Sequence, residues 1–192
     1  MNSVTQEIVE LVGRPPSPID AGAADAAEWG CVEQRLGLRL PPDFKQVLSV
    51  FGTCTWASFL HLLTPFTSNE NLQLERGAPR ALGAAHCVRR QYPEDIPFAL
   101  YPESGGLFPW GITDNGDTLY WLTQGPSGRW PTVILQARDP ESERHNLQMS
   151  TLILRFLRGE LESRILLDPF EGVRPMAEHS WNRTGRRTRA CS

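Results

Sequence analysis

The stretch Trp29-Gly-Cys-Val-Glu-Gln-Arg-Leu-Gly-Leu-Arg-Leu-Pro-Pro-Asp-Phe44 decides the fold, because it encodes the end of one helix, a tight turn and the start of another. Trp29, Val32 and Leu36 are spaced i, i+3 and i+7, so they share one face of the first helix. Gly37 follows at the position where helices commonly end in a left-handed residue. The pattern predicts an apolar helix face that packs into a core.

The second helix of this pair is expected to begin within Leu40-Pro41-Pro42-Asp43, because proline is well tolerated in the first turn of a helix. Gly52 is expected to end it. The first helix of the pair is expected to run from about Asp20 to Leu36. The apolar stripe of the second helix consists of Phe44, Val47, Leu48 and Phe51.

Short apolar segments in the middle of the chain indicate an antiparallel meander. Asn115-Gly116 lies between two aromatic-rich segments and favours the two positive φ angles of a type I′ hairpin turn. Gly125-Pro-Ser-Gly128 marks a second reversal. The expected strands are residues 97–101, 107–113, 117–123 and 131–136.

The flanking segments add one strand and two helices. Residues 56–66 form a short, bounded apolar run and are expected to be a strand. A helix from about residue 69 to 90 is expected to break or kink near Gly77-Ala-Pro79. A last helix is expected to open at Ser150-Thr151 and to stop at Gly159.

This order of elements indicates an α+β fold, in which helices pack on an antiparallel sheet of about five strands. A length of 192 residues suits one sizeable domain. We expect three parts: an N-terminal helix with a proline linker (residues 1–19), the domain itself (20–170) and a flexible, arginine-containing tail (171–192).

Charge is divided unevenly along the chain. The tail holds five arginines against two glutamates, or +3, so residues 1–170 carry −6 of a total of −3. An acidic body makes nucleic-acid binding unlikely and suits a basic protein partner. No apolar run approaches the roughly 18 residues of a membrane span, and Glu7 and Glu10 stand where a signal peptide carries positive charge. We expect a cytoplasmic protein without a membrane partner.

The reactive residue types show no catalytic or metal-binding spacing. The cysteines contain no C-x-x-C pair and the histidines do not cluster. Cys54, Ser58 and Cys87 lie in no nucleophile motif such as G-x-S-x-G. His61 lies in an apolar run and is expected to be structural. We therefore expect no enzyme activity, no metal and no cofactor.

Three stretches together resemble the SUKH superfamily, which includes yeast cell-wall assembly regulators and many bacterial immunity proteins. The first is the opening stretch, with its W-x-x-x-E, L-G and L-P-x-D-aromatic elements, and the second is Gly52. The third is Leu107-Phe-Pro-Trp-Gly-Ile-Thr-Asp-Asn-Gly-Asp-Thr-Leu-Tyr-Trp121, similar to the family's glycine-and-aspartate strand pair. The resemblance extends over residues 26–160. The motif positions are Trp29, Glu33, Gly37, Leu40, Pro41, Gly52, Trp110, Gly111, Asp114, Gly116 and Asp117.

This resemblance implies a non-catalytic α+β domain that presents a variable surface to protein partners. The commonest bacterial role in the superfamily is neutralising a toxin by direct binding, and a basic toxin would suit the acidic body. Members in other lineages serve as signalling scaffolds, so an intracellular adaptor without a toxin partner is the alternative. A small-molecule or enzymatic role in a pocket between helices and sheet is a third possibility.

The motif residues themselves are interpreted as structural. Trp29 and Glu33 are i, i+4 neighbours, so we expect the indole in the core and the carboxylate accepting hydrogen bonds from a loop or a helix N-terminus. Asp114 and Asp117 lack the spacing of a calcium loop. Asp117 is expected to accept hydrogen bonds from amides of the turn or of a neighbouring strand.

Aromatic residues in the meander are the candidates for partner contact. Strand alternation places Tyr120 and Trp121 on opposite faces, so one of them is expected to face a partner or to lie under a helix. Exposed aromatic side chains often anchor protein interfaces. The candidate partner-binding residues are therefore Trp121 and Trp130.

Overall fold

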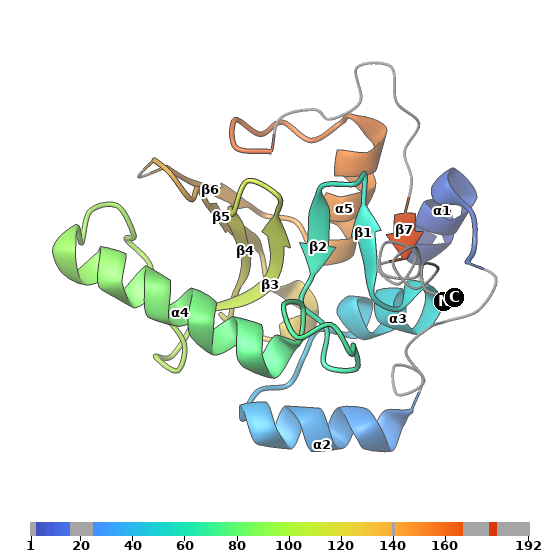
Figure 1. The fold of residues 1–192 in the computed structure, drawn as a ribbon, viewed down its shortest axis with the longest axis horizontal. Helices are drawn as coiled ribbons and strands as arrows, with labels where there is room; N and C mark the ends of the chain where they lie inside the picture. The colour runs from blue at the N-terminus through green and yellow to red at the C-terminus, as the bar shows by residue number, and fades with distance from the viewer. Residues whose placement is uncertain (1–2, 16–24, 140, 167–176, 180–192) are drawn as a thin grey trace, which may run out of the picture.

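The computed structural model describes residues 3–15, 25–139, 141–166 and 177–179, the last range by its backbone only (Figure 1). The α-helices of these ranges are α1 (Ser3–Val12), α2 (Ala26–Leu36), α3 (Pro42–Phe51), α4 (Leu74–Gln91) and α5 (Met149–Arg158). The strands are β1 (Cys54–Trp56), β2 (Leu60–Leu62), β3 (Leu107–Thr113), β4 (Thr118–Leu122), β5 (Thr132–Leu135), β6 (Ser142–His145) and β7 (Ala177–His179). A 3-10 turn, η2 (Ser127–Arg129), precedes β5.

The strands form one antiparallel sheet in the order β6-β5-β4-β3-β2-β1-β7. The expected α+β class, with helices packed on an antiparallel meander, is confirmed, although the sheet has seven strands where about five were expected. Strand β6 lies at the edge of the sheet, and its sequence Ser-Glu-Arg-His is polar throughout, so it shows none of the apolar alternation by which a strand is predicted.

The strand expected at residues 97–101 is wrong. In this segment Leu100 makes one isolated bridge to Leu107, and no ladder forms. Pro97 and Pro102 flank it and have no N–H to donate to a neighbouring strand. The segment instead leads back from α4 to the sheet.

The single strand expected at residues 56–66 is also wrong, because a tight turn divides it into β1 and β2. Ala57 and Ser58 have φ angles of +53° and +54°, and the amide of Phe59 donates to the carbonyl of Trp56 at 3.0 Å. Two consecutive positive φ angles are the signature of a type I′ hairpin turn. Residues with a Cβ rarely adopt them, so the sequence carries no sign of this turn.

The turn expected at Asn115-Gly116 exists but has a different geometry. Only Gly116, at +92°, has a positive φ angle there. The Gly116 amide donates to the Thr113 carbonyl at 3.0 Å, and the Thr113 amide donates to the Asp117 carbonyl at 2.9 Å. These bonds define a three-residue loop that ends in a left-handed glycine, so the type I′ prediction is corrected.

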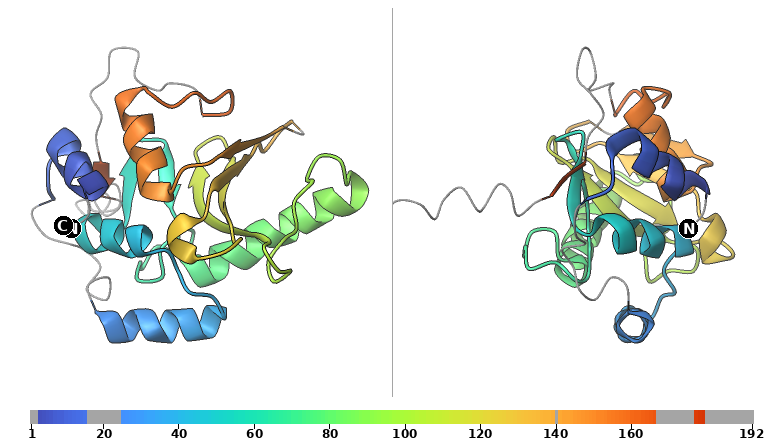
Figure 2. Two further views of the ribbon diagram at one scale, coloured as in Figure 1. Left: turned by 180° about the vertical axis from the view of Figure 1, so that it is seen from behind. Right: turned by 90° about the vertical axis from the view of Figure 1, so that its right-hand side faces the viewer.

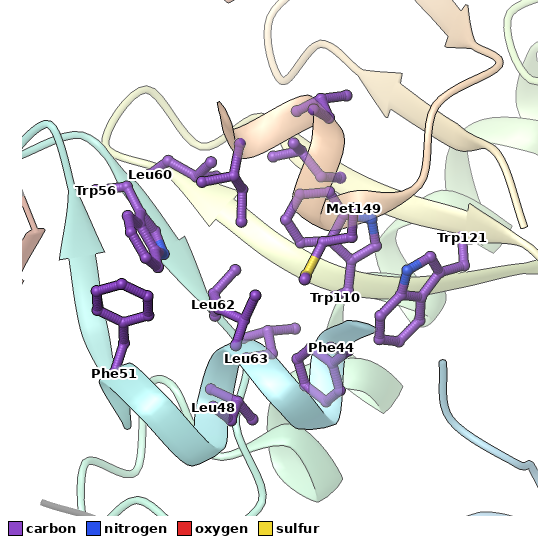
Figure 3. Close-up of a cluster of buried hydrophobic side chains, with 14 of the residues drawn as sticks. Phe44, Leu48, Phe51, Trp56, Leu60, Leu62, Leu63, Trp110, Trp121 and Met149 are labelled. Atoms are coloured by element: carbon purple, nitrogen blue, oxygen red, sulfur yellow. The ribbon is translucent and has the colours of Figure 1, made fainter. Parts of the chain in front are cut away.

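Helices cover both faces of the sheet, with α4 on one side and α1, α3 and α5 on the other (Figure 2), and divide the interior into two cores. The larger core combines buried side chains of the sheet with those of α1, α2, α3 and α5 and of the start of α4. Figure 3 shows part of it, with Trp121 close to Phe44. The smaller core lies under α4, which contributes Leu82 and Ala85. Tyr120 lies in the smaller core and Trp121 in the larger one, which explains why both side chains of adjacent positions are buried.

The helices form where the sequence predicts them, with two differences. Within the described residues α2 begins at Ala26, because the Asp25 carboxylate accepts a hydrogen bond from the Ala27 amide at 2.8 Å. The expected start near Asp20 lies outside the described residues. Helix α4 runs unbroken through Pro79, whose ring is on the exposed side. Gly77 lies within the unbroken helix, and a Cβ there would meet the Leu63 side chain at 3.0 Å, so the glycine lets α4 pack closely against Leu63.

The two ends of the chain meet the same body. Ile8 of α1 is fully buried in the larger core, and Glu7 forms an ion pair with Arg158 of α5 at 2.9 Å. The backbone of β7 pairs with β1, so the part of the expected flexible tail at residues 177–179 is ordered as a strand. The rest of the tail, including its arginines, lies outside the described residues.

Candidate protein-binding surface

Glu33 joins α2 to the turn that follows it. Its Oε1 accepts a hydrogen bond from the Leu40 amide at 2.8 Å and lies 2.5 Å from the Lys45 Nζ. Lys45 also lies 5.6 Å from the centre of the Trp29 ring, in cation–π range. Trp29 is 5% exposed. The expectation that the indole is buried and that the carboxylate serves a loop amide agrees with this geometry.

The glycines and prolines of the motif shape the helix ends. Gly37 has a φ of +64°, and its amide donates to the Gln34 carbonyl, which completes a left-handed helix end. Pro41 precedes the first turn of α3, and Leu40 is buried beside it. Gly52 combines φ +62° with ψ −154°, a conformation that essentially only glycine adopts.

Asp43 links the start of α3 to the start of α5. It is 5% exposed, and its Oδ2 accepts a hydrogen bond from the Ser150 amide at 3.0 Å. The first amides of a helix have no partner within the helix, and a carboxylate beside them is favourable. Asp43 belongs to the L-P-x-D pattern, but the sequence around it indicates no role for its carboxylate, because its partner lies 107 positions away.

The aspartates of the β3–β4 turn have separate structural roles. Asp117 is 3% exposed and accepts hydrogen bonds from the Thr113 hydroxyl at 2.8 Å and the Ala137 amide at 3.0 Å. Asp114 is bonded to His61 Nε2 at 2.7 Å. The expected role of Asp117 as an acceptor for neighbouring amides agrees with these contacts.

His61 of β2 connects β1 with the turn that follows β3. Its Nδ1 lies 3.0 Å from the Thr55 hydroxyl, while its Nε2 contacts Asp114. The chemical order hydroxyl, imidazole, carboxylate matches that of a catalytic triad. Thr55, however, is only 2% exposed, so its hydroxyl is not open to a substrate. The arrangement acts as a cross-link, which agrees with the structural role expected for His61.

Trp110 and Gly111 form an irregularity in β3. The pairing with β4 shifts between Pro109 and Gly111, which leaves Trp110 at the bulge and fully buried. A Cβ at Gly111 would lie 3.2 Å from the carbonyl oxygen of His61, so the glycine allows a close approach of the neighbouring strand. These two motif positions therefore shape the sheet.

The two tryptophans selected for partner contact are buried, and that interpretation is corrected. Trp121 is 1% exposed and packs edge-on against Phe44, with ring centres 5.0 Å apart. Trp130 is 5% exposed and donates its indole N–H to the Gly125 carbonyl at 2.9 Å. Alternation in β4 does place Tyr120 on the other face, but α4 covers that face, so both aromatic rings enter cores.

A groove lies between the C-terminal half of α4 and the β5–β6 turn. Its volume is about 480 Å³. One wall carries small and apolar residues of α4, and the other carries residues 135–139. Within the described chain the large hydrophobic side chains that are exposed are Val88, at 41%, and Tyr92, at 55%, and both line this groove. We therefore take the groove as the candidate binding surface.

Tyr120 closes the floor of this groove. Its burial raises the pKa of its hydroxyl to about 12, although a hydrogen bond with Thr118 acts in the opposite direction. The phenol therefore stays neutral near pH 7 and can offer a neutral polar group inside an apolar cavity. Sequence reasoning missed the groove, because Val88 and Tyr92 continue the apolar stripe of α4 and look like core residues.

A second hollow lies between α2 and α3, with a volume of about 760 Å³. Trp29, Glu33 and Lys45 line it, and they are already engaged with one another. Among the described residues no group of three or more His, Cys, Asp or Glu side chains is gathered as a metal site. None of the helices in the described ranges is long and apolar enough to cross a membrane.

The fold and the site define an α+β domain whose motif residues build the scaffold, while an apolar groove faces solvent. The chain belongs to the SMI1 / KNR4 family (SUKH-1), whose model matches residues 23–151. The SUKH membership inferred from the three sequence stretches is thereby confirmed. A search of curated proteins and a search of solved structures each found no match to the chain.

Proposed function

We propose that this chain is an immunity protein that neutralises a bacterial toxin in the cytoplasm by binding it directly. The observation that carries the proposal is the family match over residues 23–151. In bacteria the commonest role of the SUKH superfamily is protection against such toxins. The motif residues described above have scaffold roles, so the function rests on the surface and needs no catalytic group.

Two features of the surface support this proposal. Residues 1–170 carry a net charge of −6, which would speed the encounter with a basic partner through long-range attraction. The groove beside α4 exposes Val88 and Tyr92, and exposed apolar residues within a rim of polar ones are typical of protein-binding sites. In this proposal the bound chain covers the toxin's active or docking surface.

Co-expression with the toxin encoded beside its gene tests the function. Cells that produce both proteins should grow like cells without the toxin, and an inactive form of the toxin should elute together with the chain on gel filtration. An unrelated toxin, against which the chain should give no protection, is the control. Failure to protect, together with the absence of a complex, would rule out the immunity function.

A further inference from the structure

Most of the residues that line the groove beside α4 lie outside the family motif, although Gly116 of the motif is among them. Ala81, Ala85 and Val88 share one face of α4 at i, i+4 and i+7, and Tyr92 follows directly after the helix. Because the first two side chains are small, the helix leaves space between itself and β5. Figure 1 shows the C-terminal end of α4 projecting beyond the strands, on the side where the β5–β6 hairpin ends.

Some of the apolar side chains that line the groove are exposed to solvent. Ala85 and Tyr120 lie at its floor and belong to the smaller core, whereas Val88 and Tyr92 are 41% and 55% exposed. Burying an apolar side chain against these surfaces would be favourable, because it removes apolar area from water. A tyrosine at the rim is also a residue type enriched among the anchors of protein interfaces.

Carboxylates stand on both walls of the groove. Asp95 follows the end of α4, and Asp139 lies on the β5–β6 turn. Among the described residues no ion pair engages either of them, whereas Glu141 on the same turn is paired with Arg164 at 2.7 Å. Arg138 is the one cation among the described residues that line the groove, so carboxylates outnumber cations at its rim. The rim is therefore suited to hold a positively charged group next to an apolar one.

We propose that this groove takes a protein segment that presents an apolar side chain flanked by lysine or arginine. The apolar side chain would enter between Ala85, Val88 and Tyr120, and the cations would pair with Asp95 and Asp139. This inference rests on the proposed function for the source of the segment, the toxin. The chemistry of the segment follows from the apolar floor and the acidic rim of the groove. It does not depend on whether the toxin supplies the segment.

Affinity measurements with an inactive form of the neighbouring toxin test the groove directly. Tyr92→Glu and Asp139→Lys should each weaken binding by a factor of at least about ten, since interface anchors commonly have effects of this size. Glu28→Lys makes the same charge change on the exposed side of α2 and should leave the affinity within about twofold. Tyr92→Phe keeps the ring and should bind like the wild type. Circular dichroism checks that each variant is folded.

A toxin that binds the wild type, Tyr92→Glu and Asp139→Lys equally well would overturn the groove inference and leave the immunity function standing. If no toxin complex forms at all, the immunity function fails, and the groove is decided by a peptide probe. The probe is a synthetic amphipathic peptide of about 15 residues with leucines on one face and lysines on the other. Its leucine–glutamate counterpart is the control.

In backbone NMR spectra of the full chain, the leucine–lysine peptide should shift the signals of Val88, Tyr92 and Asp139, and the glutamate peptide should not. Equal binding of the two peptides, binding that leaves these signals unmoved, or no binding would overturn the inference. Self-association of the chain that Tyr92→Glu abolishes would assign the groove to a second copy and would also overturn it.

Discussion

At the scale of single residues, three carboxylates connect separate segments of the backbone. Each accepts a hydrogen bond from an amide outside its own element, so that loops and helix ends keep one position. The acceptors Glu33, Asp43 and Asp117 bind the amides of Leu40, Ser150 and Ala137, respectively. The residues most typical of the family are thus organisers of the fold, and binding specificity must come from other positions.

Replacing Asp43 by alanine should lower the free energy of unfolding by ~1–3 kcal/mol, because the buried Ser150 amide loses its acceptor. Asp43→Asn keeps an acceptor oxygen and should be milder. Asp139→Ala, at an exposed position, should change stability by less than about 0.5 kcal/mol. Urea denaturation of the three variants measures these differences. Equal stability of Asp43→Ala and the wild type would contradict the cross-link between α3 and α5.

Tyr120 should be the last of the three tyrosines to ionise. Burial raises the pKa of its hydroxyl to about 12, above the ordinary value of 10. Because the folded state has the higher pKa, the associated stability is present below pH 10 and is lost as the pH rises toward 12. Titration of tyrosinate absorbance should show one late step that Tyr120→Phe removes. Complete ionisation by pH 11 in a protein that is still folded would contradict this account.

At the scale of elements, apolar periodicity predicted the helices better than the strands. The stripes of α3 and α5 and the glycines that end them appear where expected, because several residues repeat the same signal. The boundary between β1 and β2 was not predicted, because alanine and serine rarely adopt the positive φ angles that Ala57 and Ser58 have. Strand β6 was missed because its residues are polar.

The contacts of the motif side chains could be anticipated from the sequence, whereas the candidate groove could not. The place of Glu33 beside a loop amide follows from local spacing, since its partner is only seven positions away. The groove depends on how far α4 stands from β5, which is set by contacts between distant segments. The tryptophans of the meander were chosen as contacts because sequence alone does not show which strand faces are covered by helices.

Glu143 attaches strand β6 to the segment after α5 by hydrogen bonds. Burial alone would raise the pKa of Glu143, but hydrogen bonds from Ser163, the Arg164 amide and His145 together lower it. A carboxyl whose pKa is lowered by folding stabilises the protein above its unfolded pKa, and this contribution is lost as the pH falls.

Denaturation at neutral and at acidic pH tests this attachment. Between pH 7 and pH values below the unfolded pKa of about 4.3, the wild type should lose more stability than Glu143→Gln does. Glu162→Gln, at an exposed position of the same segment, should behave like the wild type. An identical acid response of the wild type and Glu143→Gln would show that the hydrogen bonds of Glu143 contribute nothing to stability.

At the scale of the whole molecule, the chain consists of a scaffold and a surface. Two cores and the carboxylate cross-links fix the scaffold, whereas the acidic body and the groove beside α4 are available to a partner. Such a division allows a family to keep one fold while its members bind different proteins. We therefore propose that the whole chain acts by binding and not by chemistry.

The most direct test of that claim titrates the purified toxin encoded beside the gene with the full-length chain. Both the heat of binding and the remaining toxin activity are measured. We predict a saturable complex of fixed stoichiometry, with toxin activity falling in proportion to the fraction bound. A chain that releases no heat and leaves the activity unchanged would contradict the claim, as would inhibition by a small catalytic amount of the chain.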